Sequence, residues 1–318
     1  MRKVLYHANC KDGFAAALVC WLKFGDENTE YKPVTYGRDS EFDGIVREIH
    51  PHDEVIIVDF SYSARQLRMI VDAGASLLVL DHHKTAEANC TGPEAQELGV
   101  DKFCRFDMTK SGCRMAWEHF FPMQMAPALI LYVEDRDLWK FQYEETRKVC
   151  AGLDVLPQTF RIWEACLVDV RGLKQTGAGI LTYNKGIIDN ALRQVTFNKW
   201  LRLVREPIPC LNAMVLWSEI GEAMNRTFST CSFSATYYAI RTSPGPTKEI
   251  AQGDLGPVNL GPVTERIVAG DERVKWKWSL RSQSGFDVSA LARAFGGGGH
   301  AAAAGFVTDT IEEVIAPW

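Results

Sequence analysis

Three apolar runs in the first part of the chain end in aspartate or histidine, and this recurrence constrains the fold most. Residues 79–83 read Val-Leu-Asp-His-His, so an acid and two imidazoles follow a run typical of a buried strand. Ligands bind beyond the carboxyl ends of strands in open α/β sheets, so we expect such side chains to share one sheet edge. The polar residues that follow the three runs are His7, Asp59, Asp81, His82 and His83.

The first half of the chain predicts an α/β domain with a parallel sheet, because short β-branched runs alternate with amphipathic stretches. Between residues 157 and 203 the pattern is helical, with no strand-like run. Ser63 is a plausible helix N-cap. The predicted strands lie at 2–6, 31–36, 54–59 and 75–80, and the predicted helices at 13–24, 63–73, 109–120 and 127–134.

A chain of 318 residues suits two domains. Two prolines in residues 206–209 break any helix, so we place the boundary there. The prediction is a catalytic domain at 1–190, a helical connector to about 205, and a smaller α/β domain at 206–318. In the second domain we expect strands at 213–217, 232–240 and 274–281, a helix at 288–294, and a long loop or irregular hairpin at 243–273, whose role the sequence leaves open.

Charge and cysteine usage limit the classes of function. The formal charge of −5 disfavours bulk binding to duplex nucleic acid, although a local basic patch survives such an average. Nine scattered cysteines without a CxxC pair indicate reduced thiols and a cytoplasmic protein. We find no apolar stretch long enough to span a bilayer, and the N-terminus does not read as a signal peptide.

The acidic and histidine residues predict a metal site. Mixed imidazole and carboxylate ligation favours Mn²⁺ or Mg²⁺, with Zn²⁺, Fe²⁺ or Co²⁺ as alternatives. Two ions roughly 3.5–4 Å apart are normally bridged by a carboxylate and a water. Asp59 is our choice for the bridge because it ends the most apolar strand. The alternative is that each acid caps a helix and each histidine is a core or surface residue, but the recurrence at strand ends favours the metal.

The fourth acidic position leaves a choice between Asp135 and Asp137. We prefer Asp135 because it follows the apolar turn at 131–133, and Asp137 could cap the next turn or hold Arg136. Residues 111–112, Ser-Gly, could present backbone N–H groups to an anion, but a plain helix start is the simpler interpretation.

Four consecutive glycines at 296–299, followed by His300, form a second constellation. Without Cβ atoms, the N–H groups of Gly297, Gly298 and Gly299 could approach an anion closely. We expect a helix to follow at 301–304, and a flexible linker is the alternative.

The predicted strand at 274–281 alternates in character. One face, which is apolar and should pack on a helix, carries Val274, Trp276, Trp278 and Leu280. The other face carries Lys275, Lys277 and Arg281. For the two lysines a solvated edge is the simpler interpretation.

Together these motifs resemble the DHH phosphoesterase superfamily, which includes RecJ-type exonucleases, nanoRNases, cyclic-dinucleotide phosphodiesterases and family II pyrophosphatases. Residues 81–83 carry the Asp-His-His triplet, preceded by two strand-end sites. Residues 295–300, Phe-Gly-Gly-Gly-Gly-His, and 303–306, Ala-Ala-Gly-Phe, resemble the signature of the associated DHHA1 domain. Both motifs stand in the expected order, and the resemblance spans nearly the whole chain.

The resemblance implies a site in the cleft between the two domains, with a pair of Mn²⁺ ions, or Mg²⁺, Co²⁺ or another divalent ion. It implies catalytic roles for Asp59 and Asp81, and makes His83 a phosphate contact or proton donor. It implies metal ligation by His7, Asp12, Asp59, His82 and Asp135, and substrate binding by Arg281, Gly297, Gly298, Gly299 and His300.

The first motif departs from the family pattern. Many members carry two aspartates there, whereas this chain offers Asp12 with Asn9 or Cys10 where the other carboxylate would fall. A softer or neutral ligand would weaken one site for Mn²⁺, so the metal pair could be asymmetric. Cys10 could equally pack beside the strand, as free cysteines often do.

The resemblance implies hydrolysis of short single-stranded oligonucleotides or dinucleotides to mononucleotides by metal-activated water. The alternatives are a cyclic-dinucleotide or other signalling-nucleotide phosphodiesterase, a RecJ-like single-strand exonuclease, and a catalytically silent nucleotide-binding protein. No membrane partner is expected, and the sequence leaves a homodimer open.

Overall fold

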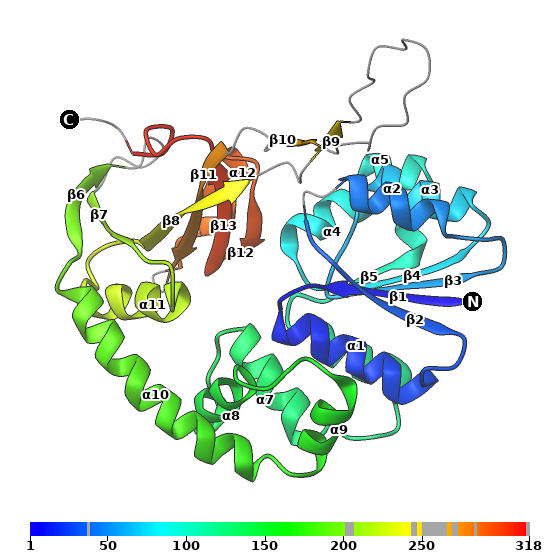
Figure 1. The fold of residues 1–318 in the computed structure, drawn as a ribbon, viewed down its shortest axis with the longest axis horizontal. Coiled ribbons are helices and arrows are strands. Elements are labelled where there is room, and N and C mark those ends of the chain that lie inside the picture. The colour runs from blue at the N-terminus through cyan, green and yellow to red at the C-terminus, as the bar shows by residue number, and fades with distance from the viewer. Residues whose placement is uncertain are drawn as a thin grey trace, which may run out of the picture. The chain divides into compact units, whose positions relative to one another are not determined.

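The computed structural model describes residues 1–36, 39–200, 207–242, 247–249, 266–268, 273–282 and 285–315. Contacts divide the chain into two units, Met1–Gly186 and Ile187–Trp318 (Figure 1). The division falls inside helix α10 (Arg171–Leu192), upstream of the proline pair near residue 206. No helix in the described ranges is long and apolar enough to cross a bilayer.

The first unit contains a five-stranded parallel sheet, which confirms the predicted α/β fold. Tyr6 pairs with Val58 and Val58 pairs with Leu80, so the carboxyl ends of three strands lie level. The residues that follow these ends therefore meet at one edge. In spatial order the strands are β2 (Thr29–Val34), β1 (Arg2–His7), β3 (Glu54–Val58), β4 (Ser76–Asp81) and β5 (Cys104–Phe106), of which β5 was not predicted.

Alternate residues of these strands enter two separate cores, one on each face of the sheet. On β1, Val4 and Tyr6 enter one core and Leu5 the other, as strand alternation requires. Figure 1 shows helices along both faces of the sheet. The first core is closed by α1 (Lys11–Phe24), α6 (Gly112–Phe120), α7 (Ala128–Asp137), α8 (Thr146–Leu153) and α9 (Phe160–Val168), and the second by α2 (Asp39–Arg47), α3 (Ala64–Asp72), α4 (Lys84–Thr91) and α5 (Pro93–Glu97).

Local signals explain where two of these helices begin and end. Ser63 caps α3, since its hydroxyl accepts from the Gln66 N–H while the Gln66 side chain accepts from the Ser63 N–H, which confirms that prediction. Helix α7 runs to Asp137, beyond the predicted end at 134. It stops where Trp139 takes a positive φ of 56°.

The second unit is built on a six-stranded mixed sheet, in which β7 and β8 are parallel and the other neighbours antiparallel. In spatial order the strands are β12 (Gly298–His300), β13 (Ala303–Thr308), β11 (Arg273–Arg281), β8 (Ser234–Thr242), β7 (Pro207–Asn212) and β6 (Thr196–Trp200), with helices α11 (Trp217–Thr227) and α12 (Val288–Ala294) and a separate pair, β9 (Thr247–Glu249) and β10 (Arg266–Val268).

The alternation predicted for β11 is confirmed at Trp278 and Leu280 but not at Val274, which is exposed. Trp278 and Leu280 are fully buried in a core shared with Leu291 of α12. On the other face Lys275 pairs with Asp309.

Three local predictions for this unit are wrong. The strand predicted at 213–217 is β7, which ends at Asn212, and Trp217 already starts α11. The stretch before 203 contains a strand, β6. Residues 303–304 belong to β13, because strand pairing overrides the helix propensity of alanine. Most of 243–273 lies outside the described residues.

Helix α10 crosses α8 at glycine positions, which gives a matched test. A Cβ on Gly177 would lie 1.8 Å from the carbonyl oxygen of Lys148, whereas nothing lies within 4 Å of a Cβ on Gly179. We expect Gly177→Ala to lower the free energy of unfolding by about 1–3 kcal/mol, from overpacking. Gly179→Ala should raise it by up to about 1 kcal/mol, since alanine loses less backbone entropy. Denaturant unfolding checks both, and equal effects would contradict this packing.

Candidate metal centre

The level ends of β1, β3 and β4 bring His7, Asp59 and His82 to one edge of the first sheet, as predicted. Asp59 has a left-handed backbone, with φ 54°. Such a conformation costs about 1–3 kcal/mol in a residue other than glycine, and it clusters at functional sites. The Asp59 N–H donates to the Leu80 carbonyl at 2.9 Å, which holds it in place.

Two glycines let helices start directly against these strand ends. A Cβ on Gly112 would lie 2.5 Å from the Cβ of Asp59, and one on Gly13 would lie 2.3 Å from the carbonyl oxygen of His7. Only residues without a side chain fit there. The first turns of α6 and α1 therefore face the cluster directly.

Asp12, in the first turn of α1, caps α6. Its Oδ2 accepts from the Gly112 N–H at 2.6 Å and its Oδ1 from the Cys113 N–H at 2.9 Å. The group bound at the N-terminus of α6 is thus the carboxyl group of Asp12. Burial and the charges of Asp59 and Asp137 raise the pKa of Asp12 well above its ordinary value.

Three carboxylates surround one nitrogen of His82. Its Nε2 lies 3.1 Å from Asp59 Oδ1, 3.4 Å from Asp137 Oδ2 and 3.5 Å from Asp12 Oδ2. Burial lowers the pKa of His82, but the hydrogen bond to Asp59 and the nearby acids outweigh it and raise the pKa to about 10. So many buried acids around one point need neutralisation, by protonation of a carboxyl group, by a protonated imidazole or by a bound cation.

A second group lies on the other side of Asp59. His7 Nδ1 stands 3.6 Å from Asp59 Oδ2, and in the described part of the chain neither buried atom has a hydrogen-bond partner. Cys10 joins them, since the three ligand atoms lie within 4.8 Å of one another. Although burial raises it, the pKa of Asp59 is held well below its ordinary value by the imidazoles of His7 and His82. The donor set fits a divalent cation on each side of one carboxylate.

The geometry corrects the choice between the two acids of α7. Asp137 lies in the cluster with Asp12 and His82. The carboxylate of Asp135 instead accepts from the N–H groups of Gln142 and Tyr143 and from the Thr146 hydroxyl, and so holds the loop before α8. Because α7 continues through both positions, their side chains leave the helix in different directions, and only one can face the strand ends.

Asp81 positions the loop that carries both histidines. Its carboxylate accepts from the Ser61 hydroxyl at 2.6 Å, from the His82 N–H at 2.7 Å and from His83 Nδ1 at 2.7 Å. Burial lowers the pKa of His83, but Asp81 outweighs it and raises the pKa to about 9. In the metal-free protein the buried carboxylate of Asp81 therefore favours the protonated form of His83 and orients its ring.

Asn9, the other residue of the departing first motif, has a left-handed backbone with φ 55°. It lines a separate hollow of about 330 Å³ with Lys11, Asp154 and Trp163. The structure thus brings Cys10, rather than Asn9, to the group around His7.

The predicted substrate residues of the second unit have local structural roles. Arg281 donates to the hydroxyl groups of Ser218 and Ser279, at 2.5 and 3.0 Å. A Cβ on Gly297 would lie 2.1 Å from the Gly305 carbonyl oxygen, and one on Gly299 would lie 2.6 Å from that of Ala303. Close pairing with β13 therefore requires these glycines. Phosphate binding by Gly298 and His300, both in β12, stays a prediction.

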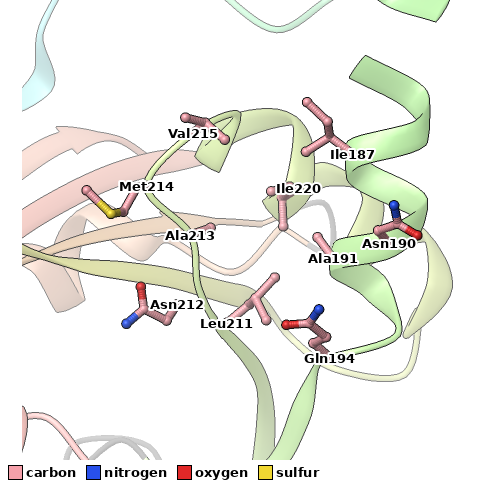
Figure 2. A pocket seen from close by; sticks show the side chains of 10 residues that line it. All are labelled: Ile187, Asn190, Ala191, Gln194, Leu211, Asn212, Ala213, Met214, Val215 and Ile220. Atoms are coloured by element: carbon pink, nitrogen blue, oxygen red, sulfur yellow. The ribbon is translucent and has the colours of Figure 1, made fainter. Parts of the chain in front are cut away.

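A further hollow of about 330 Å³ lies within the second unit (Figure 2). None of its lining side chains is ionisable, so it offers no group for acid–base chemistry or metal ligation by carboxylate or imidazole. Its lining residues are Ile187, Asn190, Ala191, Gln194, Leu211, Asn212, Ala213, Met214, Val215 and Ile220.

Several residues that build the centre were not predicted from the sequence. Gly13 and Gly112 permit the close approach of the helices, and Ser61 orients Asp81. The available signals were the glycine directly after Asp12 and the glycine at the start of α6. Neither pattern indicates its partner, because the contact of Gly112 with Asp59 joins distant segments and that of Gly13 with His7 depends on the turn between β1 and α1.

The comparison with known protein families identifies a match in the second unit. Residues 261–316 match the DHHA1 domain family, which confirms the predicted resemblance there. A curated protein from Acanthamoeba polyphaga mimivirus, described as uncharacterised, is 27% identical over 97% of this chain and 68% of its own length.

Two solved structures are similar to this chain. The pGpG-specific phosphodiesterase PggH from Vibrio cholerae has a TM-score of 0.44 and 14% identity, covering 98% of this chain and 94% of its own. RecJ from Thermus thermophilus, in complex with Mn²⁺, has a TM-score of 0.47 and 12% identity, covering 96% of this chain and 49% of its own.

The two acids of α7 provide a matched pair of variants. Asp135→Asn puts an amide where the carboxylate accepts three hydrogen bonds. We therefore expect the free energy of unfolding to fall by about 1–3 kcal/mol. Asp137→Asn should leave the metal-free stability unchanged or raise it, because it removes one of several crowded anions, and should lower the bound metal. Unfolding curves and elemental analysis separate the two, and loss of metal only in Asp135→Asn would reverse the assignment.

Metal affinity should rise with pH. With a pKa of about 10, His82 is protonated in the metal-free protein at pH 7, and that proton must leave before Nε2 can bind an ion. We expect the apparent affinity to increase about tenfold per pH unit between pH 7 and 9, with proton release measurable by calorimetry in buffers of different ionisation enthalpy. The His82→Asn variant should release fewer protons than the wild type, and a pH-independent affinity of the wild type would contradict the assignment.

Proposed function

We propose that this chain, whose residues 261–316 form a DHHA1 domain, is a metal-dependent phosphodiesterase that hydrolyses short oligonucleotides or dinucleotides to mononucleotides. One observation carries the proposal. The buried carboxylate of Asp59 has an imidazole beside each of its oxygens, at 3.1 Å for His82 and 3.6 Å for His7. When bound there, a pair of divalent ions supplies an activated water and polarises a phosphoryl oxygen.

The residues divide into two ligand groups with Asp59 shared between them. Asp12, His82 and Asp137 would hold one ion, and His7 with Cys10 would hold the other. The first group offers only nitrogen and oxygen donors, which suits Mn²⁺, with Mg²⁺ or Co²⁺ as alternatives.

His83 would act on the substrate rather than on an ion. Its Nδ1 is engaged by Asp81 at 2.7 Å, so Nε2 is the atom that would donate to a phosphoryl or leaving-group oxygen. The hydrogen bond to Asp81 favours the protonated imidazole that this step requires. Asp81 acts through His83 and is a positioning residue.

The substrate class follows from charge and size. A chain with a formal charge of −5 lacks the excess of cations that binding along a long duplex requires. We therefore propose short single-stranded or dinucleotide substrates. Arg281 and the glycine run would contact a substrate phosphate or base, and the reduced cysteines suit a cytoplasmic location.

A substrate panel tests the proposal. With Mn²⁺, the protein should release mononucleotides from labelled RNA or DNA dinucleotides to pentanucleotides. Asp59→Asn and His82→Asn should each lower turnover at least about a hundredfold, because several kcal/mol of transition-state stabilisation depend on the ions. The matched control is Asp72→Asn, an exposed acid paired with Arg68 in α3, which should keep full turnover.

Cyclic dinucleotides and long single strands, added to the panel, separate the alternatives. Turnover of cyclic dinucleotides alone would indicate a signalling-nucleotide phosphodiesterase, and degradation of long single strands a RecJ-like exonuclease. Nucleotide binding without any hydrolysis by metal-loaded protein would refute the proposal and indicate a catalytically silent protein.

A further inference from the structure

We propose that Cys10 is a metal ligand, and that its thiolate makes the His7 side of the centre selective for a thiophilic ion such as Zn²⁺ while the His82 side takes Mn²⁺. This inference rests on the metal centre of the proposed function and adds the chemical difference between its two halves. It concerns three side chains, His7, Cys10 and Asp59.

The position of Cys10 leaves its sulfur available. The residue precedes α1 at the N-cap, with extended backbone (φ −118°, ψ 138°), and its side chain makes no capping hydrogen bond. Other thiols donate to backbone carbonyls, as Cys90 does to Tyr62 and Cys150 to Tyr132, whereas the Cys10 thiol donates to no described residue. Burial and the charges of Asp59, Asp137 and Asp12 raise the pKa of the Cys10 thiol well above its ordinary value, so a thiolate at this position needs a bound cation beside it.

Two buried polar atoms of His7 and Asp59 make no hydrogen bond with any described residue. In the described part of the chain, His7 Nδ1 and Asp59 Oδ2 are buried without a hydrogen bond, although they stand only 3.6 Å apart. Buried polar atoms normally find partners, so two such atoms that face each other indicate a missing ligand. One nitrogen, one oxygen and one sulfur within 4.8 Å of one another form a compact set of donors.

The donor types decide which ion prefers which side. Thiolate and imidazole ligands select Zn²⁺ over Mn²⁺ and Mg²⁺, and three protein ligands with an open position are typical of catalytic zinc. Asp12, His82 and Asp137 offer no sulfur, so the other side keeps the hard-ion preference. The shared Asp59 would then bridge two different metals.

Cobalt titration of the metal-stripped full chain tests the ligand directly. We expect a near-ultraviolet thiolate-to-cobalt charge-transfer band in the wild type and its loss in Cys10→Ser. The matched control is Cys231→Ser, a cysteine of similar partial burial in the other unit, which should keep the band. Bound Co²⁺ or Zn²⁺ should also protect Cys10 of the wild type from alkylation, as read by peptide mass spectrometry.

Competition between ions tests the selectivity. Protein loaded from equal concentrations of Zn²⁺ and Mn²⁺ should contain both metals, by elemental analysis after desalting. In Cys10→Asp, which places an oxygen ligand at this position, the ratio of bound Mn²⁺ to bound Zn²⁺ should rise by at least about tenfold. Changes to residues that only hydrogen-bond to metal ligands already alter metal affinity by about this factor. We expect Cys10→Asp to fold even if Cys10→Ser does not, so the competition experiment does not depend on Cys10→Ser.

The outcomes separate this inference from the proposed function. Metal binding without the charge-transfer band, and with Cys10 alkylated equally fast with and without the ion, would show that Cys10 only packs beside the strand, leaving the metal centre intact. Failure of the wild type to bind any divalent ion would overturn the metal centre itself. If Cys10→Ser does not fold, the band and the alkylation protection of the wild type still decide.

Discussion

The buried carboxylate of Asp59 is the group on which the rest of the first unit depends. It ends the central strand of the sheet, its backbone is left-handed, and its oxygens face His82 on one side and His7 on the other. Isolated charges are not tolerated in a protein interior, so neighbours must compensate it. Asp12 and Asp137 add negative charge and increase that demand. A cluster of this kind favours cation binding over catalysis by acid–base groups alone.

Packing and chemistry use the same residues around this carboxylate. Gly112 lets α6 approach Asp59, and Asp12 then satisfies the first N–H groups of that helix. Asp81 ties the ends of β3 and β4 together through Ser61 and the loop that carries His83. The helices are therefore held by the groups that form the centre, which fixes the relative positions of side chains from four separate segments.

Patterns local in the sequence predicted much of this arrangement. Apolar runs that end in acid or imidazole predicted the parallel sheet and the edge where these polar side chains meet, since strand period and burial are local properties. The choice between Asp135 and Asp137 failed because it required the end of α7 to be known within one turn. Strand β6 and the strand character of Ala303 depend on pairing with distant segments, which a local pattern does not record. The glycine run was recognised, but its steric reason lies in β13.

Asp12 both caps α6 and belongs to the cluster, and these two roles affect which residues of such a centre can change during evolution. Its carboxylate serves as an anchor of the scaffold as well as a member of the cluster. A relative that no longer uses such a centre could lose His7 or Cys10 at little structural cost, but losing Asp12 would also leave two buried backbone N–H groups without an acceptor. Retention of this aspartate is thus weak evidence of activity, whereas an intact imidazole at position 7 is more informative.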